Sequence, residues 1–245
     1  MSIRRIIRFS FLQYFLLVSS SVFSQEKTGI RGDKEAIAEA ETMVEAMGGK
    51  KIWSQLKSVH FVHKWYFWNK EPYIENEILD LTGSRSWVEM KNEIYHRLRA
   101  YSPENKYWNV INGEFAYTSE ESFDAAMGTA PYNIFRLARA VAIGDPSYEV
   151  EYGEEEFPGS RRLEFSLDGE YHGHIVLNAK GEPLIWATTR YQYTFGPMAQ
   201  FGNLRVPNWA IHGKGAVSYE MISLIGDNQQ PDPKLFIPPA KYTEN

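Results

Sequence analysis

The sequence predicts a mainly β protein of the α+β kind, a single curved antiparallel sheet or unclosed β-barrel of about eleven strands with covering helices. Three observations predict it: aromatic-rich alternation, turn residues at short intervals, and two segments with helical periodicity. The clearest strand runs from Lys57 to Trp68. Four of its apolar residues occupy alternate positions and therefore share one face: Val59, Phe61, Trp65 and Phe67.

The first 24 residues predict a secretory signal peptide. Three arginines precede an apolar run from Phe9 to Val18, and Val22-Phe23-Ser24 supplies the small residues expected before a cut after Ser24. A membrane anchor is the weaker alternative, because that run is shorter than the ~20 residues a span needs. The chain has no cysteine, which excludes a lipid anchor on cysteine, disulfides and thiol catalysis. We therefore expect a periplasmic protein without a transmembrane anchor after cleavage.

Charge argues against nucleic acid as a partner. Removing the three arginines of the signal from 26 basic residues leaves 23, against 31 acidic ones. A net negative chain without a basic run does not favour nucleic acid or an anionic membrane face. The remaining residues, 25–245, are enough for one all-β domain.

The chain after the signal begins with a helical pattern. We expect residues 25–32 to form a flexible lead-in and Asp33 to cap a helix that ends near Met47. Gly48-Gly49 ends this helix, because glycine adopts the left-handed conformation without strain. Strands with turn residues between them follow, which is typical of an antiparallel meander; their expected ranges are 57–68, 73–81, 85–91, 94–101, 106–111 and 114–117.

The rhythm changes between residues 119 and 143, where a helical insertion is predicted. Ser119 is a suitable cap, and Pro131 opens a second helical stretch with one apolar stripe, formed by Ile134, Leu137, Ala138 and Val141. Strands resume at 148–152, 161–167, 171–177, 184–193, 209–213 and 216–225. We expect Phe195 to Pro207 to be a long loop and residues 226–245 to be an extended tail.

The layout resembles the LolA/LolB-like periplasmic lipoprotein-carrier fold. The residues that carry the resemblance are the helix end Glu45 to Gly49 followed by Trp53 and Leu56, the segment Gly202 to Pro207, and the closing Lys234 to Pro239. The order of helix, strand block, helical insertion and strand block agrees across nearly all of residues 25–245. The resemblance implies an unclosed barrel with helices in its mouth and a cavity that binds acyl chains or other apolar ligands.

The leading hypothesis is non-catalytic binding of an apolar ligand, a lipid, an acyl chain or a lipoprotein, in the concave face of the half-barrel. Aromatic residues make up 15% of the chain, more than one thin core needs. A half-open sheet can line its concavity with them under the apolar helical stripe. The candidate ligand-binding residues are Phe61, Trp65, Trp87, Trp108 and Trp186 on strands, with Ile134, Leu137 and Val141 on the covering helix.

Two alternatives remain open. An envelope sensor or protein-interaction domain would use the aromatic loop Phe195 to Pro207. A metal-dependent enzyme would use His172 and His174, because positions i and i+2 of a strand share a face, with His212 as a third ligand only if its strand lies alongside. The sequence has none of the usual nucleophile, zinc, phosphate-loop or calcium-loop motifs, so we expect no catalytic residue, no metal and no cofactor.

Overall fold

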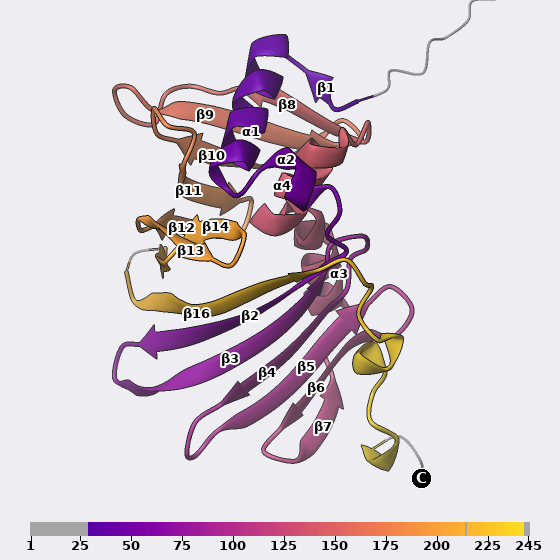
Figure 1. The fold of residues 1–245 in the computed structure, drawn as a ribbon. Helices are drawn as coiled ribbons and strands as arrows, with labels where there is room; N and C mark the ends of the chain where they lie inside the picture. The colour runs from indigo at the N-terminus through magenta and orange to yellow at the C-terminus, as the bar shows by residue number, and fades with distance from the viewer. Residues whose placement is uncertain (1–28, 214, 243–245) are drawn as a thin grey trace, which may run out of the picture.

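The computed structural model describes residues 29–213 and 215–242; the expected signal peptide lies outside the described residues. Most strands belong to one curved sheet (Figure 1). Its fourteen strands follow the order β1-β8-β9-β10-β11-β12-β15-β16-β2-β3-β4-β5-β6-β7, so the described sheet has two free edges, β1 and β7. The predicted unclosed sheet is confirmed, but the expected count of about eleven strands is too low.

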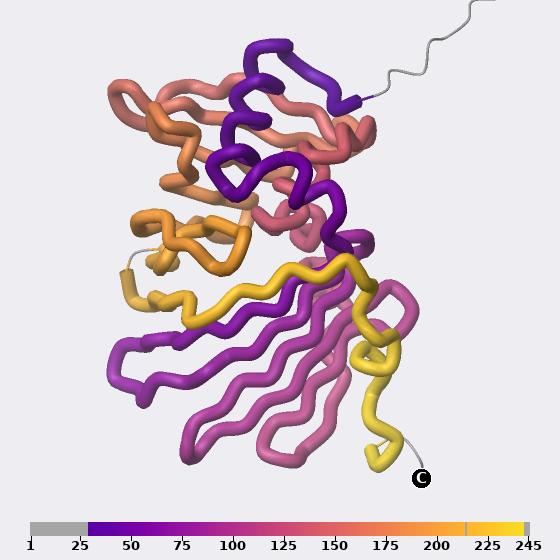
Figure 2. Tube along the Cα trace, in the orientation of Figure 1, coloured from indigo at the N-terminus to yellow at the C-terminus, as the bar shows by residue number. Residues whose placement is uncertain are grey.

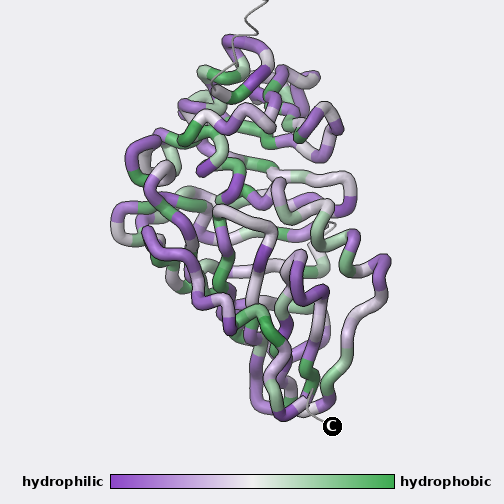
Figure 3. The backbone as a smooth tube through the Cα atoms, turned by 90° about the vertical axis from the view of Figure 1, so that its right-hand side faces the viewer, coloured by the Kyte–Doolittle hydropathy of each residue, from purple (hydrophilic) through white to green (hydrophobic). Residues whose placement is uncertain are grey.

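One half of the sheet is a six-stranded antiparallel meander. Short hydrophobic and hydrophilic stretches are interspersed along the coloured tube, which fits a sheet with two differently solvated faces (Figure 3). Tight hairpin ends between consecutive strands keep neighbours in sequence adjacent in space. The strands are β2 (Ser58–Phe67), β3 (Lys70–Asp80), β4 (Ser86–Lys91), β5 (His96–Ser102), β6 (Lys106–Ile111) and β7 (Glu114–Tyr117).

The other half comes from the later part of the chain, and β16 joins the two halves by pairing antiparallel with β2. Asp168 and Gly169 both have positive φ angles, 52° and 87°, which forms the tight turn predicted between β9 and β10. The strands of this half are β8 (Tyr148–Tyr152), β9 (Arg161–Leu167), β10 (Glu170–Leu177), β11 (Pro183–Thr188), β12 (Gln192–Phe195), β15 (Trp209–His212) and β16 (Val217–Asp227).

Two segments depart from the expected layout. Arg31 and Gly32 form β1, a short strand parallel to β8, where a flexible lead-in was expected. Gly32 makes this close approach possible, since a Cβ there would lie 1.9 Å from the Val150 carbonyl oxygen. The expected loop Phe195 to Pro207 contains a separate hairpin, β13 (Met198–Phe201) with β14 (Leu204–Pro207). Leu204 and Val206 alternate into the core, and this burial fixes the hairpin.

Helices cover the inner side of the sheet. The first helix matches the predicted range, with Met47 as its C-cap residue. Asp33 occupies the N-cap position, but its side chain makes no capping hydrogen bond. Gly144, at φ 65°, ends the last one, as its position after the apolar stripe predicts. The helices are α1 (Lys34–Ala46), α2 (Lys50–Trp53), α3 (Glu120–Thr129) and α4 (Ile134–Ile143), with the short 3-10 turn η1 (Ala130–Tyr132) between α3 and α4.

The main core lies between these helices and the sheet. It joins the buried face of α1 to α4 and to the inner residues of β8, β9 and β10. A smaller core lies on the opposite, convex face of the meander, where the C-terminal tail passes beside β4 and β5 (Figure 2). This tail contains the 3-10 turns η2 (Pro233–Phe236) and η3 (Ala240–Tyr242). Helices α3 and α4 contact the inner side of the meander, α3 beside β5 and β6 and α4 through Phe135 against Phe61.

Candidate ligand-binding site

A cavity of about 740 Å³ lies on the inner face of the sheet. Its floor begins with β2, which contributes every second residue: Phe61, His63, Trp65 and Phe67. This set follows from the period of two that the sequence showed, with His63 as the polar member of the apolar face. The long strand β2 therefore supplies one continuous aromatic stripe.

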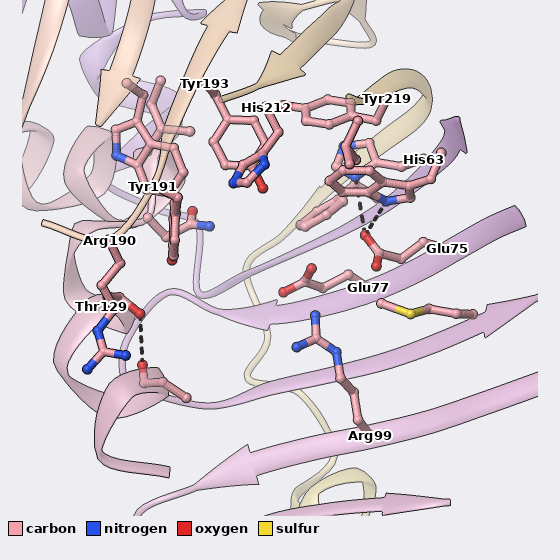
Figure 4. A pocket seen from close by; sticks show the side chains of 18 of the residues that line it. His63, Glu75, Glu77, Arg99, Thr129, Arg190, Tyr191, Tyr193, His212 and Tyr219 are labelled. Carbon is pink, nitrogen blue, oxygen red and sulfur yellow. Dashed lines mark hydrogen bonds and ion pairs between the residues drawn. The ribbon is translucent and has the colours of Figure 1, made fainter. Parts of the chain in front are cut away.

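The same alternation brings charged side chains to the floor. Glu75 and Glu77 come from β3, and Arg99 comes from β5 (Figure 4). Arg97, also on β5, lines the same cavity. The strand between them, β4, contributes Met90. The cavity that was expected to be oily thus has an aromatic wall and a charged floor, because positions two apart on β3 and β5 carry like charges.

The opposite wall comes from the second half of the sheet. Its rings contact one another across strands: Trp186 stacks on Tyr193 at 5.5 Å, and Tyr193 meets Tyr219 at 6.0 Å between ring centroids. Tyr219 in turn stacks on His63 at 4.1 Å, which connects the two halves of the sheet. The small residues Ala125 and Ala126 of α3 also line the cavity. A second cavity, of about 1020 Å³, shares four lining residues with the first: Phe67, Tyr73, Met90 and Arg97.

Glu75 is held in its charged form. The Trp65 indole donates a hydrogen bond to Glu75 Oε1 at 2.8 Å, and His63 Nδ1 lies 3.5 Å from the same oxygen. Burial acts to raise the pKa of the Glu75 carboxyl, but the contact with His63 and the nearby Arg99 outweigh it and lower the pKa.

Glu77 behaves in the opposite way. Burial raises the pKa of the Glu77 carboxyl, and the charge of Glu75 adds to the rise. Its Oε1 accepts a hydrogen bond from the Ser86 hydroxyl at 2.7 Å. Burial also raises the pKa of three tyrosines of the cavity wall, Tyr73, Tyr193 and Tyr219, so their phenols stay neutral hydrogen-bonding groups.

Four of the eight candidate residues line the cavity: Phe61, Trp65, Trp186 and Ile134. Leu137 and Val141 lie on the same helix as Ile134 but are buried in the main core. Trp87 and Trp108 lie on the convex face, in the smaller core with Phe236. Trp108 donates its indole hydrogen bond to the Phe236 carbonyl at 3.0 Å. An apolar residue of a strand can cover either face of a sheet, and here the C-terminal tail needs those two tryptophans.

Sequence reasoning missed the charged floor and most of the tyrosines. A signal for the floor was present, since Glu75/Glu77 and Arg97/Arg99 are like-charged pairs two positions apart within expected strands. Such a pair points to one face of a strand. Deciding that this face is the inner one needs the register with β2, where Glu75 is opposite His63 and Glu77 is opposite Phe61.

The two histidines of the metal alternative have different neighbours. A β-bulge between Tyr171 and Gly173 breaks the alternation on which their shared face depended. The His172 ring stacks on Tyr132 at 4.3 Å, whereas His174 Nδ1 lies 3.1 Å from the Tyr171 hydroxyl. His212 lies in the cavity wall, against Tyr193. Within residues 29–213 and 215–242, no group of three or more His, Asp or Glu side chains is placed to hold a metal ion.

The structure also alters the observation on which the protein-interaction alternative depends. The segment Phe195 to Pro207 was expected to expose aromatic residues in a loop, but Phe195 is buried and the hairpin β13–β14 packs on the core.

Among the described helices, none is long and apolar enough to cross a membrane.

Comparison with known proteins finds a solved structure whose backbone follows a similar path. No family model matches the sequence, and no curated protein matches it either. Among solved structures, the chain is similar to the crystal structure of a LolA superfamily protein from Nitrosomonas europaea, with 10% sequence identity and a TM-score of 0.49. The match covers 81% of this chain and 97% of that one. At this level the likeness says nothing about a ligand or an activity.

Proposed function

We propose that this protein binds an amphipathic, mainly apolar ligand, such as a lipid or acyl chain, in the concave cavity and releases it chemically unchanged. The observation that supports the proposal is the cavity itself: about 740 Å³, walled by aromatic rings from both halves of the sheet. Pockets for small ligands are typically about 300–1,000 Å³ and lined mainly by apolar and aromatic groups, with a few polar ones that set orientation. The export signal predicted for the first 24 residues would place this binding in the periplasm.

The energetics favour a long apolar body. Burial of a methylene is worth about 0.8 kcal/mol, so a chain of a dozen carbons has a substantial driving force even after the entropy losses of binding. The charged floor restricts the choice further. Glu75, Arg97 and Arg99 are partly or fully removed from water. A wholly apolar ligand would leave these three side chains without new partners. A ligand with one polar end satisfies both parts of the cavity.

Binding of an uncharged fluorescent probe tests the proposal. 1-N-phenylnaphthylamine brightens in apolar surroundings, and we expect saturable binding to the purified protein. Ala126→Trp places a large ring at a residue that lines the cavity and should weaken binding about tenfold or more by steric exclusion. Ala38→Trp is the matched control, since Ala38 is an exposed residue of helix α1, and should leave binding unchanged.

Mass spectrometry of the natively purified protein is the second measurement. We expect a lipid or other amphiphile in organic extracts of the wild type and of Ala38→Trp, and its loss from Ala126→Trp. An added amphiphile should also be recovered intact after long incubation. Absence of probe binding in the wild type, or equal binding by the two tryptophan variants, would contradict the proposed site.

A further inference from the structure

The charged groups of the cavity floor are separated by strand β4. In the register, Glu77 is opposite Val88, and Val88 is opposite Arg99 on the next strand. Glu75, Met90 and Arg97 form the neighbouring row in the same way. Two strand spacings amount to roughly 9.6 Å, which is the separation of the backbone positions of each glutamate and the arginine in its row. Among the described residues, neither Arg97 nor Arg99 forms an ion pair within 4.0 Å of a carboxylate.

The two arginines instead have neutral partners. Arg97 Nε donates to the Asn109 side-chain oxygen at 2.9 Å, and Arg99 Nη1 donates to the Tyr107 hydroxyl at 3.0 Å. Arg99 Nε is buried and has no hydrogen-bond partner. A desolvated guanidinium that contacts only neutral groups retains capacity for an oxyanion, with which it forms its strongest hydrogen bonds.

The glutamates cancel only part of this positive charge. Glu75 is already engaged by Trp65 and His63, and burial raises the pKa of Glu77. Three arginines line the cavity, Arg190 being the third, against two glutamates. The cavity is therefore positive by at least one charge inside a chain whose formal net charge is −5.

The chemical class of the ligand's polar end is an inference that rests on the proposed function. We propose that the ligand is an anionic amphiphile whose head group, a carboxylate or a phosphate, binds Arg97 and Arg99, while its apolar chain lies along the aromatic wall. Arg97 lines both cavities and so stands where they meet.

Head-group exchange on a constant chain tests this assignment. Dodecanoate, dodecyl phosphate, dodecanol and dodecylamine, each below its micellar concentration, compete with bound 1-N-phenylnaphthylamine at pH 8. We expect one or both anions to displace the probe at about tenfold or more lower concentration than dodecanol, as a charge-assisted hydrogen bond allows. Comparing the two anions distinguishes a carboxylate ligand from a phosphate one. Equal potency of dodecanol, or a preference for dodecylamine, would overturn the proposal and leave the apolar site itself intact.

Substitutions of Arg97 and Arg99 test whether these residues cause the preference for an anionic head group. Arg99→Met should abolish the advantage of the anion over dodecanol, measured as the ratio of the two competing concentrations in the same variant, because methionine keeps the apolar stem but lacks the charge. Arg205→Met removes a charge that pairs with Glu182 outside the cavity and is the matched control. Persistence of the anion preference in both Arg99→Met and Arg97→Met would refute the assignment. The wild-type comparison decides the matter alone if either variant fails to fold.

Discussion

Glu75 and Glu77 lie two positions apart on one strand, yet their surroundings shift their pKa values in opposite directions. The sequence identifies both as residues of a single strand face, because strand side chains alternate. It does not reveal the partners that separate them, Trp65 and His63 for one and Ser86 for the other. Those partners lie on adjacent strands, and their approach depends on register, which is a property of the folded sheet.

Opposite pH dependences of stability follow for this pair. The lowered pKa of Glu75 means that its contribution is present above the unfolded-state pKa and is lost as pH falls through the folded-state value. The raised pKa of Glu77 means that its contribution is present at low pH and is lost as pH rises above 4.5 through the folded-state value. We expect Glu75→Gln to destabilise by about 1 kcal/mol at pH 7, since a charge-assisted hydrogen bond becomes a neutral one.

Glu77→Gln is the matched comparison, because glutamine keeps an acceptor for Ser86 and remains uncharged. The stability of Glu77→Gln relative to the wild type should be higher at pH 8 than at pH 5, because the wild type loses the contribution of Glu77 as pH rises. Urea denaturation of both variants and the wild type at pH 3, 5 and 8 provides the measurement. The same trend with pH in the two variants would contradict the opposite environments assigned to these carboxyls.

Elements with strong local patterns follow the sequence closely. The helix expected from Asp33 to Met47 is α1, and the strands expected at 161–167 and 171–177 form the hairpin β9–β10. The departures occur where distant contacts decide: β1 forms only because β8 lies beside Gly32, and the bulge at Tyr171 changes the neighbours of His172. Local propensity contains no information on such pairings.

The C-terminal tail shows how one residue can anchor an element. Phe236 is 1% exposed against the convex face, and its neighbour Ile237 is 50% exposed. Arg85 lies over the Phe236 ring at 5.1 Å, and the carbonyl of Phe236 accepts the Trp108 hydrogen bond. Phe236→Ala should therefore lower the free energy of unfolding by about 3–5 kcal/mol and expose the tail to limited proteolysis.

Ile237→Ala is the control for that anchor, with an expected change within about 0.5 kcal/mol. Thermal and urea unfolding, with the sites of proteolysis mapped by mass spectrometry, measure both variants. Comparable losses in the two would mean that the tail is held by its backbone and not by the Phe236 ring.

At the scale of the whole molecule, the cavity exists because the last strand, β16, closes against the first long strand, β2. The pairing runs from Val217 opposite Phe67 to Asp227 opposite Ser58. It brings Tyr219 onto His63, so neither half of the sheet could form the aromatic enclosure alone. The alternation of residues could predict an aromatic face on each half of the sheet. The contact between these two faces depends on the pairing of β2 with β16, which are far apart in the sequence.

A ligand that bridges the two halves should stabilise the whole fold. A ligand that binds only the native state adds about 2.7 kcal/mol at a concentration one hundred times its dissociation constant. For a chain of this size, each kcal/mol corresponds to roughly 2–4 °C, so the best-binding dodecyl amphiphile should raise Tm by roughly 5–11 °C. The shift should grow with the logarithm of ligand concentration, because the linkage is logarithmic. Ala126→Trp should remove most of it and Ala38→Trp should preserve it in the same differential scanning fluorimetry series. An undiminished shift in Ala126→Trp would place the binding outside the enclosure, since the added ring would then have excluded nothing.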